Sequence, residues 1–471
     1  MPIMEPYRIK VVEPIPLLTR AERERALAQA GYNMFNLRAD EVTIDLLSDS
    51  GTGAVSAAQQ AAAAIGDESY AGGKSFFRFQ DVVTELTSFP HIYPVHQGRA
   101  AERILFTALL RKGQITLSNT HFDTTKANIE LLGCQARDLP CPEASDLDSH
   151  EPFKGNIDLG ALEDTLIGAD AERIGFVIIT ITNNGGGGQP VSMANLQATS
   201  TLCRRHSIPF LLDAARFAEN AWLVTQREPQ YRDANPAEVA QRTFALVDGC
   251  VASLKKDGIS PMGAFLAMHD ANLAGRCEPI LTATEGFRTY GGLTGHDLDQ
   301  LAQGLREVLE PDYLRARAAS ATYLAQLIND GGIHTVQPPG IHAIYLNAGR
   351  LLPHLPLAQF PGHALACQLY LEGGIRCAEL GSLYQGTLDE NNELLTAAPY
   401  ELVRLALPRR VYTKSHYEYV AEVLTGIAKH PESVPGYRIV HSPHVLRHFN
   451  STMEPVPLCT SPNMTPERHT G

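Results

Sequence analysis

A lysine and an aspartate stand where two predicted strands end. Lys256 follows the apolar run 245–253, and Asp213 directly follows the apolar run 208–212. A lysine can form a Schiff base with pyridoxal phosphate (PLP), and a buried aspartate keeps the pyridine nitrogen of that cofactor protonated, so that its ring accepts electrons. The pair therefore indicates a PLP site. Many α/β proteins carry an aspartate after one strand and a lysine elsewhere, so the pattern alone leaves a purely structural role open.

The segments around this pair alternate between short apolar runs and helical patterns. We expect further strands at 114–119 and 173–182, and a helix over 192–206 that Ser192 caps. Strands separated by helices form parallel βαβ units. Open α/β sheets bind ligands at the carboxyl ends of their strands, which is where the lysine and the aspartate stand. The sequence thus predicts an α/β fold with a mostly parallel sheet.

The pattern changes after about residue 300. A helical stretch over 297–329 precedes apolar strands at 341–346 and 402–407, with a helix over 362–372 between them. This α+β arrangement is typical of a second, smaller domain. Residues 451–471 are rich in Pro, Ser and Thr, so we expect a poorly ordered tail there.

The composition excludes several classes of protein. The chain has 471 residues, 44% of them hydrophobic and 19% charged, which is enough for two or three domains. A net charge of −13 disfavours binding to nucleic acid or anionic membranes. No apolar run approaches the ~20 residues that span a bilayer, and the start lacks the features of a secretory signal, so a cytoplasmic location is expected.

Cysteines and histidines give no metal-binding pattern. The eight cysteines form no C-x-x-C pair and are expected to be free thiols. The 17 histidines show no H-E-x-x-H motif, so a zinc site is not expected.

Two glycine-containing segments could approach a phosphate. The glycines at 185–188 lack a Walker lysine and a G-x-G-x-x-G pattern, which favours a tight strand-to-helix turn. Gln97, Gly98 and Arg99 open a helical segment after an apolar run. Free amides, the helix dipole and a guanidinium converge at such a position, which suits a phosphate, although a structural role is as consistent with these residues alone.

The chain resembles the tryptophanase (tryptophan indole-lyase) and tyrosine phenol-lyase family of β-eliminating lyases over residues 5 to 450. The resemblance is carried by blocks that occur in matching order, at 5–10, 44–55, 66–72, 96–99, 187–192, 213–220, 255–257, 290–293 and 408–413. It implies the PLP-dependent aminotransferase-like fold (fold type I), with a large mostly parallel-sheet domain and a smaller α+β domain. The implied boundaries are 1–54 for the N-terminal arm and part of the small domain, 55–310 for the large domain, 311–450 for the small domain and 451–471 for the tail.

The resemblance also implies which residues contact PLP. Lys256 would form the Schiff base and then remove the proton at Cα of the substrate, which gives a quinonoid. Asp213 would pair with the pyridine nitrogen. The other contacts would be Phe122 on the ring face, Asn184 and Arg216 at the phenolic oxygen, and Gln97, Gly98, Arg99 and Ser253 at the phosphate.

For the substrate, the family places an arginine on the α-carboxylate, and the matching residue is Arg404. A guanidinium suits this role because its planar fork matches a carboxylate bidentately. Other implied substrate contacts are Ser48, Ser50, Asn184, Leu380 and Phe35.

The resemblance also implies a proton donor from a neighbouring subunit and a site for a monovalent cation. Tyr70 matches a tyrosine that protonates the departing aromatic carbon and reaches the site from a neighbouring subunit of a homotetramer. Gly51, Glu68 and the carbonyl of Pro261 match a site for a monovalent cation, usually potassium (K+).

Three positions bear on whether the leaving group is indole or phenol. Asp123 follows the stacking residue, where phenol-lyases carry threonine, and Leu380 stands where they carry arginine. His448 lies in the sequence Arg-His-Phe-Asn, similar to the Arg-His-Phe-Thr of tryptophanases. A carboxylate can accept the indole N–H, and a histidine can support proton transfer to the ring carbon. Together they favour L-tryptophan, with products indole, pyruvate and ammonia.

Other substrates and roles stay open at this stage. Ala100, Asn183, Ala264 and Arg288 depart from the family's pattern near the pocket, so tyrosine or an S-substituted cysteine is an alternative substrate. A PLP-binding protein without activity would be expected to lack Lys256, Tyr70 or Arg404, and all three are present.

Overall fold

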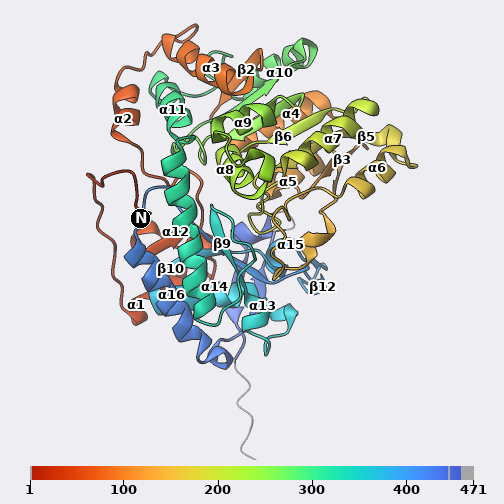
Figure 1. The fold of residues 1–471 in the computed structure, drawn as a ribbon. Coiled ribbons are helices and arrows are strands. Elements are labelled where there is room, and N and C mark those ends of the chain that lie inside the picture. Colours follow the sequence, from red (N-terminus) through yellow and green to blue (C-terminus); the bar gives the residue numbers. More distant parts are fainter. Residues whose placement is uncertain (1–2, 444–445, 458–471) are drawn as a thin grey trace, which may run out of the picture.

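The computed structural model describes residues 3–443 and 446–457 (Figure 1). Its larger sheet has seven strands in the order β2 (His91–Val95), β8 (Ala264–Met268), β7 (Gly249–Ser253), β6 (Phe210–Asp213), β5 (Ile174–Thr180), β3 (Ile115–Ser118) and β4 (Gln135–Asp138). Strands β7 to β4 run parallel to one another, and β8 is antiparallel to both of its neighbours. The predicted α/β class with a mostly parallel sheet is confirmed.

Both faces of this sheet are buried. Successive residues of a strand point to opposite faces, and in β5 Phe176 and Ile178 pack into one apolar cluster while Val177 and Ile179 pack into another. Helices therefore cover both faces, as is typical of parallel sheets. The first face carries α4 (Gly98–Leu109) and α10 (Ala271–Thr284), and the second carries α3 (Lys74–Thr87), α7 (Met193–Arg205), α8 (Phe217–Arg227), α9 (Pro236–Phe244) and α11 (Gly295–Glu307).

A four-stranded mixed sheet lies below the larger one in Figure 1. Its order is β1 (Ile44–Leu46), β10 (Ile375–Glu379), β13 (Leu402–Ala406) and β9 (Ala343–Asn347), and only β1 and β10 are parallel. Its apolar core joins residues 26–46 to residues 321–453. The helices that contribute to this core are α1 (Arg20–Gln29), α12 (Pro311–Asp330), α14 (Pro361–Gly373) and α16 (Lys414–Ala428).

The expected single helix over 297–329 is in fact two helices, α11 and α12. Pro311 occupies the first turn of α12, where its missing N–H costs nothing, whereas inside a helix it would remove a hydrogen bond. The chain therefore turns between Glu307 and Pro311. α12 then runs from the level of the large sheet to that of the small one (Figure 1). Ser192 caps α7 through the amide of Asn195, as predicted.

The expected tail is partly structured. Thr452–Pro455 form β15, which pairs antiparallel with β14 (Tyr437–His441), and Met453 is buried. The expectation of a poorly ordered segment is wrong for these residues, because the ladder and the small apolar core hold them. Residues 458–471 lie outside the described part of the chain.

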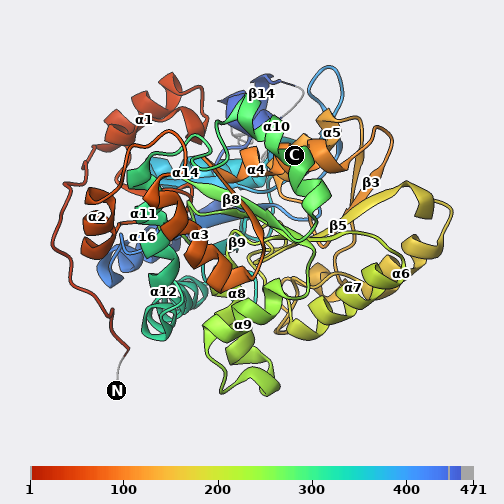
Figure 2. The ribbon, with the colours of Figure 1, turned by 90° about the horizontal axis from the view of Figure 1, so that it is seen from above.

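Shorter elements complete the fold (Figure 2). They are α2 (Ala57–Ala64), α5 (Asp123–Leu131), α6 (Leu159–Ile167), α13 (Ala348–Leu351), α15 (Ser382–Gln385), α17 (Arg447–Asn450), β11 (Thr387–Leu388) and β12 (Leu394–Thr396).

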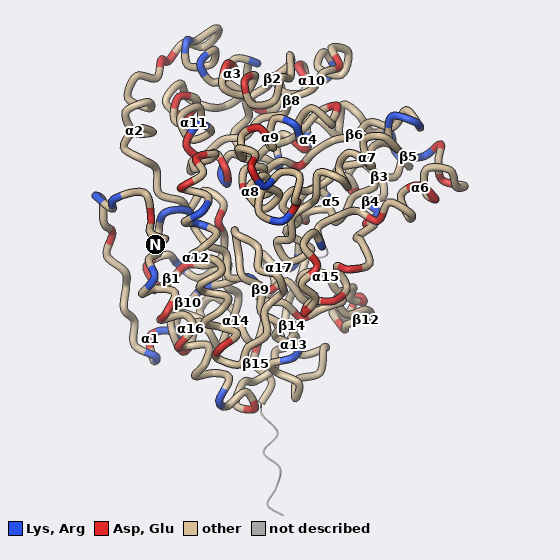
Figure 3. Tube along the Cα trace, in the orientation of Figure 1, with Lys and Arg blue, Asp and Glu red and all other residues tan. Residues whose placement is uncertain are grey.

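Figure 3 shows Lys and Arg interspersed with Asp and Glu over both parts of the molecule. In residues 3–443 and 446–457, no helix has the length and apolar character that crossing a bilayer requires. The seven cysteines within the same residues are free and buried.

Candidate active site

A cavity of about 640 Å3, open to solvent, lies at the carboxyl ends of β6 and β7. All residues that were predicted to contact the cofactor line it, namely Gln97, Gly98, Arg99, Phe122, Asn184, Asp213, Arg216, Ser253 and Lys256. Ser50 lines it as well. The fold thus brings together side chains from β6, the β7–β8 connection, the start of α4 and the loop after β5.

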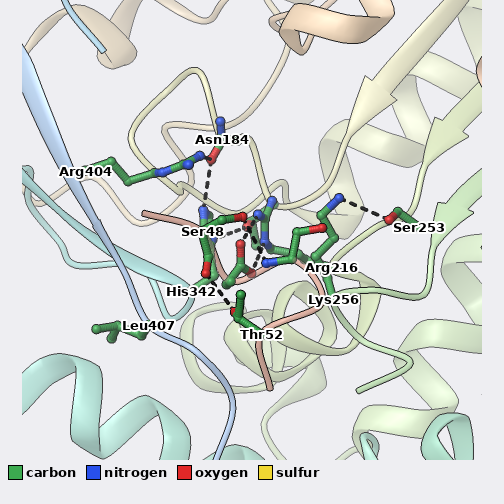
Figure 4. Close-up of polar contacts among 12 residues, drawn as sticks. Ser48, Thr52, Asn184, Arg216, Ser253, Lys256, His342, Arg404 and Leu407 are labelled. Atoms are coloured by element: carbon green, nitrogen blue, oxygen red, sulfur yellow. Dashed lines mark hydrogen bonds and ion pairs between the residues drawn. The ribbon is translucent and has the colours of Figure 1, made fainter. Parts of the chain in front are cut away.

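Lys256 and Asp213 lie at the ends of neighbouring parallel strands. Asp213 is the last residue of β6, and Lys256 follows β7 by three residues and donates from Nζ to Ser253 Oγ at 3.1 Å (Figure 4). Burial, followed by the nearby Arg216, lowers the pKa of Lys256 to about 8. A neutral amine, which is the nucleophilic form, is therefore accessible near neutral pH. Burial raises the pKa of the Asp213 carboxyl, and Lys256 opposes that rise.

The start of α4 offers a cradle for an anion. Gly98 is its first residue, and a Cβ there would lie 2.8 Å from Ser253 Cβ, so only glycine permits this approach. Gln97 does not cap the helix with its own side chain, which leaves the first amides open. Burial and the charge of Arg99 lower the pKa of Lys255, which also lines the cavity. Amides, Arg99 and Lys255 together suit a phosphate.

Arg404, on β13, contacts Asn184, a residue that lines the cavity. Its Nη1 donates to Asn184 Oδ1 at 2.9 Å and its Nη2 to the Leu47 carbonyl at 2.9 Å (Figure 4). The Nδ2 of Asn184 and the Nε of Arg404 are buried and have no hydrogen-bond partner among the described residues. Ser48 lies close by, and its Oγ accepts the Ser50 amide at 3.1 Å. Leaving a buried donor without an acceptor costs free energy, so unpaired donors of this kind indicate a site for a ligand that accepts hydrogen bonds.

A second group of predicted residues meets at the N-terminus of α5. His448 Nε2 lies 3.5 Å from Asp123 Oδ2, and both side chains are nearly buried. Phe35 packs edge-on against His448, with ring centroids 5.8 Å apart. Leu380 is buried in a small apolar cluster with residues of β9 and β13. Tyr384, which sequence reasoning missed, places its ring 4.7 Å from that of His448 and joins the same cluster.

Tyr70 and Glu68 lie away from the cavity in the single chain. Tyr70 is 73% exposed and packs against Phe287 and Tyr290. Glu68 is exposed and forms an ion pair with His296 at 3.2 Å. A residue expected to act in a neighbouring subunit's site would lie on the surface in this way, but the chain alone does not test that role.

Gly51 and Pro261 do lie together. A Cβ on Gly51 would be 3.0 Å from the Pro261 carbonyl oxygen, and the Gly51 amide donates to the Lys255 carbonyl at 2.7 Å. Gly51 has a φ of 75°, which favours glycine. No cluster of three or more His, Cys, Asp or Glu side chains with metal-binding geometry occurs within the described residues.

A buried ionic cluster below the cavity was not found from the sequence. Arg216, predicted at the cofactor's phenolic oxygen, lines the cavity but pairs with Asp49 through Nε at 3.0 Å and Nη2 at 2.7 Å. Arg409 is 1% exposed and contacts three carboxylates, those of Asp49 at 3.0 Å, Glu219 at 2.9 Å and Asp257 at 2.7 Å. Arg317 adds a second contact to Glu219 at 2.8 Å. The members come from five separate parts of the chain, so no local sequence pattern pointed to the cluster.

Glu102 is another residue that sequence reasoning missed. It lines the cavity from α4, and its carboxylate accepts hydrogen bonds from Thr124, Thr125 and Asn128. Burial, with Asp213 as the second cause, raises the pKa of Glu102 to about 7. Its i, i+3 spacing from Arg99, which also lines the cavity, was the available signal.

The fold defines the class of protein. A search of solved structures finds Bna3p of Saccharomyces cerevisiae, described as a candidate kynurenine aminotransferase, at a TM-score of 0.61 and 14% identity, covering 87% of this chain and 95% of the other. A SepCysS–SepCysE N-terminal domain complex matches at a TM-score of 0.54 and 14% identity, covering 83% and 95%. At such identities the likeness shows the fold alone, which is that of the PLP-dependent aminotransferase-like proteins.

The sequence comparisons define the family. The β-eliminating lyase family model matches residues 45–423. A tryptophanase of Hyphomonas neptunium is 48% identical over 452 residues, which is 96% of this chain and 99% of the relative. A tyrosine phenol-lyase of Nostoc punctiforme is 43% identical over 450 residues, 96% of each chain. The chain belongs to the β-eliminating lyase family and is a PLP-dependent lyase whose small-molecule substrate is an amino acid.

The cavity fits PLP. It offers an anion cradle at α4, a buried carboxyl at Asp213 for a ring nitrogen, and a lysine with a lowered pKa. The Asn184 Nδ2, unpartnered within the described part of the chain, supplies a donor for an oxygen of the ring.

Proposed function

We propose that the chain catalyses the α,β-elimination of L-tryptophan to indole, pyruvate and ammonia. The observation that carries the proposal is the Asp123–His448 pair, whose neighbour Tyr384 packs against the apolar cluster that contains Leu380. A carboxylate next to a histidine suits an indole N–H and the proton that must reach the ring carbon. A phenolate oxygen would call for a cation at that end, and Leu380 supplies none.

Lys256 would hold PLP covalently and would act as the base at Cα of the substrate. Asp213 would pair with the ring nitrogen, Asn184 and Arg216 would contact the phenolic oxygen, and Phe122 would contact the ring face. Gln97, Gly98, Arg99 and Ser253 would hold the phosphate. When bound, PLP accepts the electron pair that remains at Cα after proton removal.

The substrate's α-carboxylate binds to Arg404, whose free Nε and forked geometry support this role. Ser48, Ser50 and Asn184 complete the polar contacts, and Phe35 contacts the aromatic ring. The ring carbon must be protonated before the Cβ–Cγ bond breaks, because an aromatic carbanion is a poor leaving group. Tyr70 of a neighbouring copy is the proposed acid.

This role for Tyr70 requires an assembly, and the proposal includes a homotetramer. It also includes a potassium ion held by the Gly51 region, the Pro261 carbonyl and Glu68, with Glu68 supplied across the same subunit contact. The exposure of Tyr70 and Glu68 in the single chain supports both parts.

The test is pyruvate release by the purified protein with PLP and potassium, on L-tryptophan, L-tyrosine and S-ethyl-L-cysteine. Indole and pyruvate from tryptophan, with little release from tyrosine, are expected. Release from S-ethyl-L-cysteine alone would leave the β-elimination in place and refute the aromatic assignment. Replacing potassium by lithium is expected to lower turnover, and unchanged turnover would refute the cation site.

A further inference from the structure

The amide of Asn184 is held through its oxygen by buried side chains of β9 and the segment before it. Tyr345 donates from its hydroxyl to Asn184 Oδ1 at 2.9 Å, at the same oxygen that Arg404 Nη1 contacts at 2.9 Å. His342 Nε2 lies 3.2 Å from this oxygen and 3.0 Å from the Tyr345 hydroxyl. Tyr345 is 2% and His342 0% exposed, so solvent does not replace these contacts. Figure 4 shows Asn184 between Arg404 and His342.

These donors specify which way the amide faces. A guanidinium can only donate, so its partner must be the amide oxygen and not the NH2 group. The hydroxyl of Tyr345 meets the same oxygen, which turns Nδ2 away from Tyr345 and Arg404. Asn184 also lines the cavity. No described residue accepts from Nδ2. The amide is thus fixed through its oxygen, which leaves its NH2 group as the group that can donate to a ligand.

The protonation of His342 is consistent with this arrangement. Burial, followed by the charge of Arg216, lowers the pKa of His342, so the ring is neutral and carries one N–H. We assign that hydrogen to Nε2, facing the Tyr345 oxygen, while Nδ1 accepts from Thr182 Oγ1 at 3.1 Å. Tyr345 then accepts from His342 and keeps its own hydrogen for Asn184.

Tyr345 and Arg404 do not hold the amide equally. Arg404 is proposed to engage the substrate's carboxylate, and its side chain is partly exposed. Tyr345 lies in a β-strand and packs in an apolar cluster with Val336, Leu380 and Leu402. Its hydroxyl therefore stays in place when Arg404 turns to a substrate.

We propose that Tyr345 is a positioning residue that fixes the orientation of the Asn184 amide, so that Nδ2 faces the phenolic oxygen of PLP. This inference rests on the cofactor contacts of the proposed function and does not depend on which amino acid is cleaved. Tyr345 touches neither cofactor nor substrate in this role and acts through Asn184.

The decisive variant is Tyr345→Phe, which keeps the aromatic ring and removes only the hydroxyl. We expect about a tenfold rise in the Kd for PLP, the size of one buried hydrogen bond, and a shift of the visible absorbance band of the bound cofactor. Tyr370→Phe is the matched control, because Tyr370 is also buried and donates its hydroxyl to the Glu41 carbonyl at 3.0 Å, within the small core. That control should leave both the Kd and the band unchanged.

A double-mutant cycle separates positioning from a purely structural role. If Tyr345 acts through Asn184, then adding Tyr345→Phe to Asn184→Ala should change the Kd for PLP no further. Additive losses would overturn the proposal, as would an unchanged Kd and band in Tyr345→Phe alone. A Tyr345→Phe chain that does not fold, while Tyr370→Phe does, would also overturn it, because the hydroxyl would then be structural. Absence of indole release would refute the tryptophan assignment and leave these titrations interpretable.

Discussion

The cofactor end of the site and its aromatic end differ in what supports them. Asp213 ends β6 and Lys256 follows the adjacent strand β7, close to an ionic cluster in which Arg409 contacts three carboxylates. Asp123 and His448 stand on helix termini from different parts of the chain and approach only to 3.5 Å. The first end is fixed by a continuous hydrogen-bonded framework. The second is assembled from short segments that are far apart in the sequence.

The buried charges under the two ends differ as well. Below the cofactor end, Asp49, Glu219 and Asp257 are balanced by arginines. Below the aromatic end lie two carboxyls, Glu379 and Glu401, whose partners are backbone amides of α15 and its surroundings. The framework that carries the common chemistry is thus charge-balanced. The part that would choose the leaving group rests on two carboxyls that form no ion pair among the described residues. This difference predicts that substitutions at the two ends have different effects on activity and stability.

The largest effect is expected for Lys256→Ala. Turnover should fall by at least about 10⁴-fold, the upper range for an acid–base group, on L-tryptophan and S-ethyl-L-cysteine alike, because both need the proton at Cα removed. Pyruvate release with each substrate is the measurement. Lys126→Ala, at an exposed lysine of α5, serves as the control and should retain activity. A variant that loses only the aromatic substrate would refute the assignment of Lys256 to the common step.

The next largest effect concerns stability. Arg409→Met removes the positive charge shared by three buried carboxylates, and we expect a loss of about 3–5 kcal/mol in the free energy of unfolding. Arg438→Met, which breaks an exposed pair with Glu454, should cost less than about 1 kcal/mol. Denaturant titration of both variants checks this. Similar losses in the two would mean that the cluster is not the support of the cofactor end.

The difference between the two ends also explains how much the sequence could predict. The cofactor end was predictable because each of its two residues lies at the end of a strand that the sequence pattern indicates. Asp213 ends β6, and Lys256 follows β7. Adjacent parallel strands necessarily bring such residues to one edge of the sheet. The local sequence was also sufficient to predict that Ser192 caps α7.

The supports below the site were not predictable in this way. Asp49 pairs with Arg409 across 360 positions of sequence, and no local pattern encodes such a contact. Tyr345 occupies an apolar strand, where a tyrosine is also an ordinary core residue, so its contact with Asn184 needed the fold. The resemblance to a family named Asp123 and His448 separately, whereas their approach to each other and Tyr384 beside them came only from the structure.

A substitution at the aromatic end should affect the aromatic substrate and spare the non-aromatic one. Asp123→Asn keeps the size of the side chain and removes its charge, so we expect about a 10²-fold loss with L-tryptophan, typical of one proton-transfer partner. S-ethyl-L-cysteine, whose leaving group needs no ring protonation, should be affected by less than about threefold. The ratio of kcat/KM for the two substrates is the measurement. Equal losses on both would refute the division of the site into two ends.

The smallest effect is expected at the Glu379–Glu401 pair. Burial, with Glu401 as the second cause, raises the pKa of Glu379 above its usual 4.5, so the folded chain keeps this proton to a higher pH than the unfolded chain. Above pH 4.5 the folded state therefore binds more protons. The contribution of Glu379 is fully present below pH 4.5 and is lost as the pH rises through the folded pKa, at about 1.4 kcal/mol for each unit of the shift.

Glu379→Gln should remove this dependence while keeping the oxygen that accepts the Gly381 and Leu383 amides. We expect the variant to be more stable than the wild type at pH 8.5, by roughly 1–2 kcal/mol, with the difference shrinking toward pH 4.5. Unfolding titrations at both pH values test this, with Glu432→Gln at an exposed position as the control. A wild type that is the more stable of the two at pH 8.5 would mean that Glu379 is ionised and paired. The aromatic end would then be charge-balanced like the cofactor end, and the contrast between them would be lost.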